Sequence, residues 1–282
     1  MLSEIFQINF KLSKLNMNKR IIGGSMKKRL LKKDKKNQPL ITIITVVLNN
    51  RRFLQKTIDS VLNQSYKNYE FIVIDGKSTD GTVNILQKNN SKIDFWISEK
   101  DKGIYDAMNK GMRMSRGSII VILNSDDIFY KNALKIAVKY FNQNKFIDFL
   151  FGSVKKYKLL YGYKPWKIKW SFGFYSTHSI GFFIKKNSQK KVGFYNTKYK
   201  YSSDYDFFYR MIVKYKLIGM ATKKNEIFGK FRRGGISSKL SNNAFLKEIY
   251  QVRVDNGQNK IFVIFLLFLK YIRFNLKKFL KL

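Results

Sequence analysis

Short runs of apolar, largely β-branched residues alternate with helical patterns in the first half of this chain. These runs are at residues 40–48, 69–74, 93–97 and 118–123. Continuous apolar runs of this length are typical of strands that are buried on both faces of a parallel sheet. The segments between them carry apolar residues at helical spacing. The alternation therefore predicts an α/β fold with a Rossmann-like, doubly wound and mostly parallel sheet.

Acidic residues stand at or near the ends of the predicted strands. Asp75 follows one strand, Asp101 follows the next, and the pair Asp126 and Asp127 follows the last. Ligands of a doubly wound sheet bind beyond the carboxyl ends of its strands. Adjacent carboxylates repel each other, and Mg²⁺ or Mn²⁺ can compensate this charge while bridging to substrate phosphates. A solvated turn or helix cap is the alternative for one acid, but it does not explain why several acids converge.

Several other classes of site lack their sequence signals. No Gly-x-Gly-x-x-Gly motif follows the first strand and no Gly-x-x-x-x-Gly-Lys-Ser/Thr motif occurs, which disfavours dinucleotide enzymes and P-loop nucleotidases. The chain has no cysteine, so thiolate catalysis and thiolate metal sites are excluded. With His178 as the only histidine, a multi-histidine zinc centre is also excluded. Basic side chains and a metal would have to hold phosphate instead.

Four motifs resemble those of the family 2 glycosyltransferases in order and spacing. They are at residues 45–49, 73–82, 101–111 and 124–127. The resemblance covers about residues 40–240 and points to the non-processive type that builds colanic acid, capsule or lipopolysaccharide. It implies a glycosyltransferase A fold, a nucleotide diphospho-sugar donor, a saccharide or polyprenyl-linked acceptor, and inverting transfer to a hydroxyl assisted by Mg²⁺ or Mn²⁺.

The resemblance also assigns roles in the first half of the chain. Asp75 resembles the acid that binds the nucleotide base, and Lys102 stands where the family often has a basic residue near the nucleotide. Asp126 resembles the acid near the ribose or metal, and Asp127 resembles the direct metal ligand. Structural roles are expected for two further acids, Asp80 as a cap and Asp106 on a helix surface. The chain departs from the family pattern where Asn124 replaces a common aspartate and where Leu48 replaces a common aromatic residue.

The acceptor side is expected in the second half. The segment 202–211 resembles the family's acidic motif at the start of a helix, in which Asp204 would be the general base. A helix cap is the alternative for Asp204, and Asp206 is expected in a structural ion pair. His178 is expected to contact acceptor or diphosphate, or else to be an ordinary loop residue. Arg232 and Arg233 are expected at the leaving-group phosphate, with solvated surface arginines as the alternative.

The two ends of the chain differ from this catalytic segment, which is predicted at residues 39–240 with halves 39–127 and 128–240. Residues 1–38 are rich in Lys and Arg and predict a loosely ordered basic arm. Residues 241–282 predict an amphipathic helical tail. Its apolar run is too short to cross a bilayer, which needs about 20 residues, and it favours the surface of an anionic membrane, with a helix packed on the domain as the alternative.

The net charge of +38 alone identifies no partner, because it suits nucleic acid, an anionic membrane and phosphorylated substrates equally. Aromatic residues also crowd segment 157–175; core packing is the default interpretation, with Trp166 and Trp170 as the exceptions that could stack on a sugar. A nucleotidyltransferase and a basic nucleic-acid-binding protein are the rival functions. The acids at the strand ends favour an enzyme over a nucleic-acid-binding protein, so no specific nucleic acid is expected as partner. The expected setting is the cytoplasm, at the inner face of the membrane, where the enzyme would act on a lipid-linked saccharide.

Overall fold

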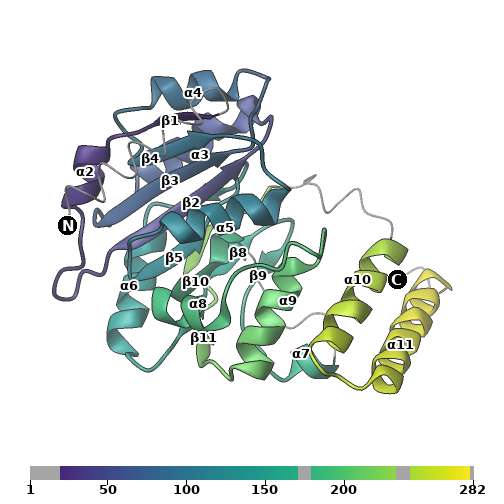
Figure 1. Ribbon diagram of the computed structural model, residues 1–282. Coiled ribbons are helices and arrows are strands. Elements are labelled where there is room, and N and C mark those ends of the chain that lie inside the picture. Colours follow the sequence, from purple (N-terminus) through teal and green to yellow (C-terminus); the bar gives the residue numbers. More distant parts are fainter. Residues whose placement is uncertain (1–19, 171–178, 233–241, 280–282) are drawn as a thin grey trace.

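The computed structural model describes residues 20–170, 179–232 and 242–279. Within them lies a central sheet of eight strands, with helices packed around it (Figure 1). The strand order is β1-β4-β3-β2-β5-β10-β7-β11. Their bounds, in that order, are Ile21–Gly23, Phe95–Ser98, Tyr69–Asp75, Ile41–Val47, Ile119–Ile122, Phe182–Lys185, Phe149–Phe151 and Gly219–Ala221. The four strands β4, β3, β2 and β5 are parallel to their neighbours in this group. The predicted mostly parallel, doubly wound α/β sheet is therefore confirmed.

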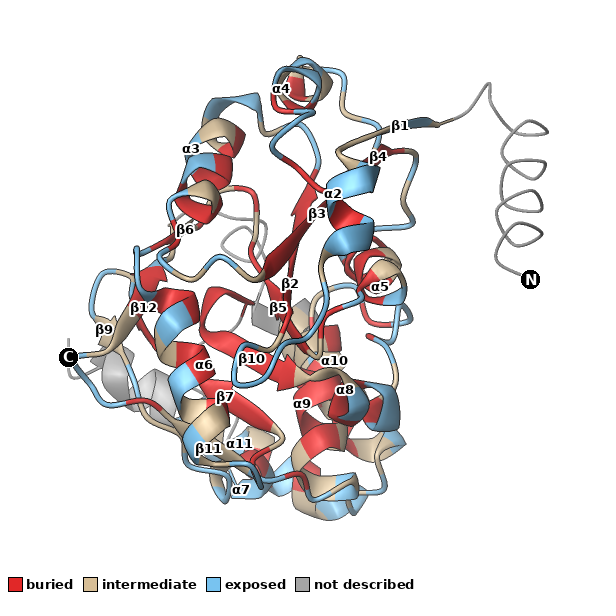
Figure 2. Ribbon diagram, turned by 90° about the vertical axis from the view of Figure 1, so that its left-hand side faces the viewer, coloured by how far each residue is buried: buried red, intermediate tan, exposed pale blue. Residues whose placement is uncertain are grey.

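The parallel strands are buried on both faces, as their β-branched composition requires (Figure 2). Successive residues face opposite sides of the sheet, so Ile44 belongs to one core cluster and Ile43 to the other. Val47 is opposite Asp75, and Asp75 is opposite Ser98. The carboxyl ends of these strands thus meet at one edge of the sheet.

Helices cover both faces of the sheet (Figure 1). They include α3 (Arg51–Leu62), α4 (Thr82–Lys88), α5 (Ile104–Met114) and α6 (Ala133–Gln143). The approach of α5 is close, because a Cβ atom at Gly111 would lie only 2.3 Å from Cγ2 of Ile44. Only a glycine allows this separation. This close packing of α5 on the sheet keeps the first turn of the helix, with Tyr105, at the carboxyl edge of the parallel strands.

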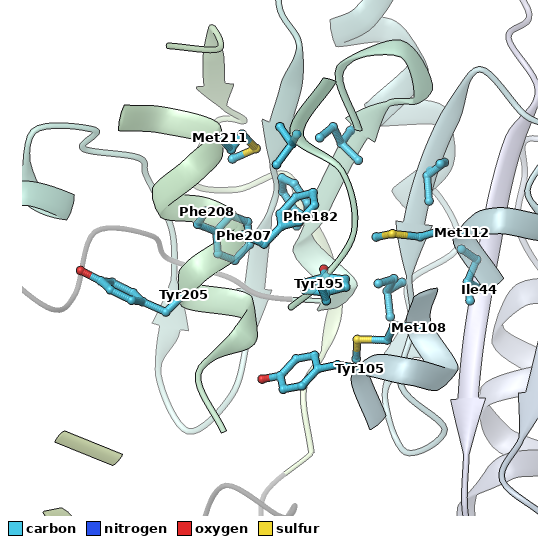
Figure 3. Packing of buried hydrophobic residues seen from close by; sticks show 14 of the residues in the cluster. Ile44, Tyr105, Met108, Met112, Phe182, Tyr195, Tyr205, Phe207, Phe208 and Met211 are labelled. Carbon is cyan, nitrogen blue, oxygen red and sulfur yellow. The ribbon is translucent and has the colours of Figure 1, made fainter. Parts of the chain in front are cut away.

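The second half adds antiparallel strands and a smaller sheet. In the central sheet, β10 is antiparallel to both β5 and β7. The smaller sheet has the order β6-β12-β8-β9. Its strands are Ile128–Phe129, Ile227–Lys230, Ser153–Lys155 and Leu159–Leu160. The helical elements of this half are α7 (Lys167–Trp170), η1 (Ser179–Gly181), α8 (Lys186–Val192), α9 (Ser203–Tyr209) and the π-helix η2 (Arg210–Lys214). Figure 3 shows Phe207 and Phe208 of α9 beside Phe182 of β10.

Residues 20–38 do not form the loosely ordered arm that their charge predicts. Strand β1 pairs with β4, and α2 (Met26–Leu31) packs beside it. The reason is a buried ion pair, in which Nε of Arg29 lies 2.7 Å from Oε1 of Glu70 on β3. Thr42 also donates a hydrogen bond to Glu70. The part of the arm before residue 20 lies outside the described residues.

Two helices, α10 (Asn242–Asp255) and α11 (Lys260–Phe279), form the C-terminal region (Figure 1). The first is part of the main folded domain, because Val252 belongs to the main core and Arg253 is fully buried. The second packs on α10 through the buried residues Val263 and Leu266. No helix in the described part of the chain is both long and apolar enough to cross a membrane.

Candidate active site

Asp75 is fully buried at the carboxyl end of β3. Its Oδ2 accepts hydrogen bonds from the hydroxyl of Ser98 at 2.5 Å and from the N–H of Ser78 at 3.0 Å. Its Oδ1 accepts one from the hydroxyl of Ser78 at 2.5 Å. Leu48 is 62% exposed and lies against Gly76, the residue after Asp75. The position that an aromatic residue often occupies is thus an open aliphatic surface next to this acid.

The loop before α5 carries Asp101 and the exposed Lys102. Nζ of Lys110 lies 2.5 Å from Oδ1 of Asp101 and 2.8 Å from Glu99. Burial raises the pKa of Asp101, although its hydrogen bond with Lys110 acts in the opposite direction. The backbone N–H of Lys102 donates to Asp106 at 3.0 Å. The Lys102 side chain is exposed to solvent at the carboxyl edge of the sheet, the same edge at which Asp75 lies.

Two acids expected to be structural are confirmed in that role. Asp80 accepts hydrogen bonds from the N–H groups of Arg51 and Thr82, the first residues of α3 and α4. These N–H groups have no partner within their own helices. Asp106 lies in the first turn of α5, where it accepts the Lys102 N–H.

The acid pair follows β5. Asp126 is half-buried, and Asp127 is only 1% exposed. The Asp127 carboxylate accepts hydrogen bonds from the hydroxyl of Ser179 at 3.1 Å and from the N–H of Arg232 at 3.2 Å. Burial, together with the charge of Asp126, raises the pKa of Asp127 to about 7. Burial also raises the pKa of Asp126, and the charge of Arg232 opposes this shift.

Ser179 connects the acid pair to Asn124. Its hydroxyl donates to Asp127 and accepts a hydrogen bond from Nδ2 of Asn124 at 3.2 Å. The φ of Ser179 is 56°, which is an uncommon backbone conformation for a residue other than glycine. Such strain is held by the surrounding structure, and here it aims the hydroxyl at Asp127.

Arg232 is the basic residue that the structure brings to the acid pair. Its Cζ lies 3.6 Å from the centroid of the Phe53 ring on α3, which is a close cation–π contact. Its N–H binds Asp127, and its charge acts on Asp126. Arg233 and His178, the other residues expected here, lie outside the described residues.

Asp204 lies in the first turn of α9 and is half-buried. The hydroxyl of Tyr105, on the first turn of α5, lies 3.3 Å from Oδ1 of Asp204 and 3.2 Å from the carbonyl oxygen of Tyr201, so its one proton has two acceptors. Oδ1 of Asp204 also accepts the N–H of Tyr205 at 2.8 Å. Asp204 therefore lies beside the N-terminal end of α5, which is at the carboxyl edge of the sheet. Asp206 pairs with Arg210 at 2.8 Å, which confirms its expected structural role.

The donor set suits a hard divalent cation that shares its ligands with a substrate. Among the residues that the structure describes, no three His, Cys, Asp or Glu side chains form a group that could hold a metal. Mg²⁺, however, is usually held by one or two carboxylates together with substrate phosphates. Asp126 and Asp127 supply these carboxylates. A cation beside them would lower the pKa values of both carboxyl groups, which burial has raised.

Sequence reasoning missed three residues of this site. They are Phe53, Tyr105 and Ser179. Tyr105 lies within the motif at residues 101–111, and Ser179 directly follows His178, so their positions in the sequence could have marked them as site residues. Phe53 looks like any core residue of an amphipathic helix, and its contact with a residue far along the chain is invisible in the sequence.

The central sheet and its covering helices have the A-type fold of glycosyltransferases. Solved structures with this fold include Staphylococcus aureus TarS 1–349 in complex with UDP-GlcNAc, with a TM-score of 0.61, 15% identity, and coverage of 80% of this chain and 70% of that one. Another is the mannosyltransferase PcManGT from Pyrobaculum calidifontis in complex with GDP-Man and Mn²⁺, with a TM-score of 0.60, 16% identity, and coverage of 82% and 69%. At this identity the likeness shows the fold alone.

Residues 42–217 match the model of glycosyl transferase family 2, and the chain belongs to this family. An uncharacterized glycosyltransferase of Methanocaldococcus jannaschii is 29% identical over 191 residues, which are 62% of this chain and 66% of the relative. An uncharacterized glycosyltransferase of Rickettsia bellii is 32% identical over 128 residues, or 45% of this chain and 18% of the relative. A PGL/p-HBAD biosynthesis glycosyltransferase of Mycobacterium bovis is 24% identical over 229 residues, which are 75% of this chain and 84% of the relative. The chain thus spans less than two thirds of the length of the first two.

Proposed function

We propose that this chain transfers one sugar from a nucleotide diphospho-sugar to a hydroxyl of a saccharide or lipid-linked acceptor, with inversion at the anomeric carbon. The observation that carries the proposal is the arrangement at the carboxyl edge of the sheet. The acid pair and Arg232 lie there with Asp75, and Tyr105 connects that edge to Asp204. A donor and an acceptor bound at this edge would meet between two sets of carboxylates.

The donor would bind along the ends of β3 and β5. Asp75 would accept a hydrogen bond from the nucleobase, which would replace the Ser78 hydroxyl on Oδ1. The exposed Lys102 would approach the nucleotide, and Asp126 the ribose or the metal. Arg232 would bind the diphosphate, with Arg233 beside it, because a guanidinium matches the geometry of phosphate oxygens.

Asp127, with Asp126, would hold Mg²⁺ or Mn²⁺. The bound cation would neutralise charge that develops on the leaving diphosphate. Mn²⁺ in the complex of the archaeal mannosyltransferase supports this choice. The hydrogen bonds from Ser179 and Arg232 fix the Asp127 carboxylate in place before the donor arrives.

Asp204 would act as the general base. Its carboxylate would take the proton of the acceptor hydroxyl while that oxygen attacks the anomeric carbon from the side opposite the diphosphate. The contact with Tyr105 at Oδ1 would help to orient the carboxylate toward the acceptor hydroxyl. His178 is proposed to contact the acceptor or the diphosphate.

The acceptor side of the molecule carries a surface suited to a membrane. The face of α11 directed away from α10 is apolar and exposed, and it consists of Ile261, Ile264, Phe265, Phe268, Leu269, Tyr271 and Ile272. Beside it, Trp170 packs edge-on against Phe262, and Trp166 is 60% exposed. Apolar and aromatic residues on a basic chain suit the interface of an anionic membrane. We place the enzyme on the inner face of the cytoplasmic membrane, acting on a polyprenyl-linked or other saccharide.

A donor panel tests the proposal. The purified full chain is incubated with UDP-, GDP- and dTDP-sugars, and nucleoside diphosphate release is measured with Mn²⁺, with Mg²⁺ and after EDTA treatment. We expect release from one donor class, loss of release with EDTA, and recovery when metal is restored. Absence of release from every donor, with salt-sensitive binding to duplex DNA, would refute the transferase and favour a nucleic-acid-binding protein.

A further inference from the structure

A carboxylate from the C-terminal region binds the backbone just before the helix that carries Asp204. Oε1 of Glu248, on α10, accepts the N–H of Lys200 at 3.0 Å. Its Oε2 accepts the N–H groups of Tyr201 at 2.8 Å and Ser202 at 2.9 Å. One side chain thus receives three successive backbone donors.

One of these donors lies at the start of α9, and the other two lie in the backbone just before it. The N–H groups at the start of a helix have no partner within the helix, and Ser202 is the N-cap residue of α9. Asp204 is two residues beyond this cap. Any movement of the backbone at residues 200–202 would therefore be passed to the Asp204 carboxylate within a single helical turn.

The same face of α10 holds this segment at further points. Oδ2 of Asp255 lies 2.8 Å from Nζ of Lys198 and accepts the hydroxyl of Tyr199 at 2.5 Å. Asn256 donates to Asp206 at 2.9 Å. Among these contacts, Glu248 is the one that binds the residues immediately before Asp204.

We propose that Glu248 is a positioning residue for Asp204, an inference that rests on the proposed function of Asp204 as base. Glu248 does not touch the substrate. It fixes the backbone from which Asp204 projects, while Tyr105 contacts the carboxylate itself at Oδ1. A base displaced by about 1 Å can cost about 100-fold in rate, so the effect of Glu248 falls on turnover and leaves donor binding unchanged.

The first test compares Glu248→Ala and Glu248→Gln with Lys247→Ala, an exposed neighbour on the same helix. We expect Glu248→Ala to lower the kcat of sugar transfer by about 10- to 100-fold with a donor KM within about twofold of the wild type. Glu248→Gln keeps the oxygen that two of the three N–H groups can use, so it should recover most of the loss. Lys247→Ala should behave as the wild type. Parallel changes in kcat and donor KM, or no rescue by Gln, would overturn the proposal.

A double-mutant cycle with Asp204→Asn separates positioning from general stability. If Glu248 acts through Asp204, adding Glu248→Ala to Asp204→Asn should lower transfer by less than about twofold. An equal fall in both backgrounds would refute positioning. Normal transfer by Asp204→Asn itself would instead refute the proposed base, which distinguishes the two failures.

Hydrogen exchange supplies a readout that does not depend on activity. Amide exchange in the peptide 198–206 should become faster in Glu248→Ala and remain unchanged in Lys247→Ala. Exchange in β2 and β3 should be unchanged in both. Unchanged exchange at 198–206 would show that Glu248 does not hold this segment, and the inference would fail whatever the kinetics.

Discussion

At the scale of single residues, Asp127 has an environment that a carboxylate on its own would not favour. It is buried beside a second acid, and its pKa is raised to about 7. The two hydrogen bonds from Ser179 and Arg232 offset only part of this cost. A divalent cation would offset the rest, which is the physical argument for assigning the metal to this acid.

The variant Asp127→Asn keeps the size of the side chain and removes its charge. We expect donor hydrolysis and sugar transfer to fall at least ~100-fold, because stabilisation of the leaving diphosphate is worth several kcal/mol. Nucleoside diphosphate release at saturating Mn²⁺ measures this. Asp59→Asn, at an exposed acid on α3, is the control and should keep wild-type rates. Near-normal release by Asp127→Asn would remove Asp127 from the metal site.

Phe53 is expected to affect donor binding through Arg232. Replacing the ring in Phe53→Leu removes a cation–π contact worth about 0.5–2 kcal/mol, so the donor KM should rise about 2- to 30-fold. Phe53→Tyr keeps the ring and should keep the donor KM. Steady-state kinetics over a range of donor concentrations gives both values. A donor KM that is the same for Leu and Phe would mean that Arg232 is held by other contacts.

At the scale of elements, α10 and the segment before α9 are joined by a pH-dependent contact. Hydrogen bonds from Lys198 and Tyr199 lower the pKa of Asp255 from 3.8 to about 2. Because the folded pKa is below the unfolded one, the carboxylate stabilises the fold fully above pH about 4, and this contribution is lost as the pH falls through about 2.

The variant Asp255→Asn tests this linkage. It should be less stable than the wild type at pH 7 and at pH 5, and the difference should shrink as the pH falls below about 4. Urea unfolding of both proteins at a series of pH values measures the difference. Lys198→Met, which removes the main partner, should show the same trend to a smaller degree. A difference that is constant from pH 5 to pH 3 would show that Asp255 titrates alike in both states.

The exposed face of α11 gives a second prediction at this scale. Val263 and Leu266 attach the helix to α10, whereas Phe265 and Phe268 point away from it with 53% and 58% of their surface exposed. The double variant with Phe265→Glu and Phe268→Glu should keep the wild-type Tm and lose most of its affinity for anionic vesicles. Phe146→Glu, at a residue that is 66% exposed next to α6, is the matched control. Equal vesicle binding by the wild type, the double variant and the Phe146→Glu control would refute the proposal that this face of α11 binds a membrane.

At the scale of the whole molecule, the fully buried Glu70 carboxylate joins the sheet to the N-terminal segment through its ion pair with Arg29. Arg29→Ala would leave Glu70 charged and buried, so we expect a loss of about 3 kcal/mol in the free energy of unfolding. Denaturant unfolding measures it. The double variant with Arg29→Met and Glu70→Gln should recover much of the stability, because no unpaired charge remains. A loss below about 1 kcal/mol in Arg29→Ala would mean that Thr42 and the Arg116 N–H satisfy Glu70 without it.

The parts of this fold that the sequence predicts are those with local, periodic signals. The long apolar strands are such cases, although β4 begins at Phe95, two residues after the predicted start, next to the point where the Asp94 carboxylate accepts the Phe71 N–H. The smaller sheet was not predicted, since strands of two to four residues carry no period and pair with distant segments. The sequence places Arg29 in a loosely ordered basic arm, because its partner Glu70 is distant in the sequence.

The candidate site divides in the same way. Asp75, Asp126 and Asp127 follow strands, so the topology of the sheet brings their backbones together and the sequence is sufficient to group them. Phe53 and Glu248 act by contacts with residues far along the chain, and no local pattern distinguishes them from a core phenylalanine or a surface glutamate. Their roles follow only from the packing of α3 and α10.

Both outer strands of the central sheet, β1 and β11, are only three residues long. The two longest strands, β2 and β3, lie well inside the sheet, where each has a partner on both sides. An exposed apolar strand of their length would be a template for pairing with another chain. The short edges leave few free backbone groups for such pairing, so the strand order itself protects this protein, rich as it is in β-branched residues, from edge-to-edge aggregation.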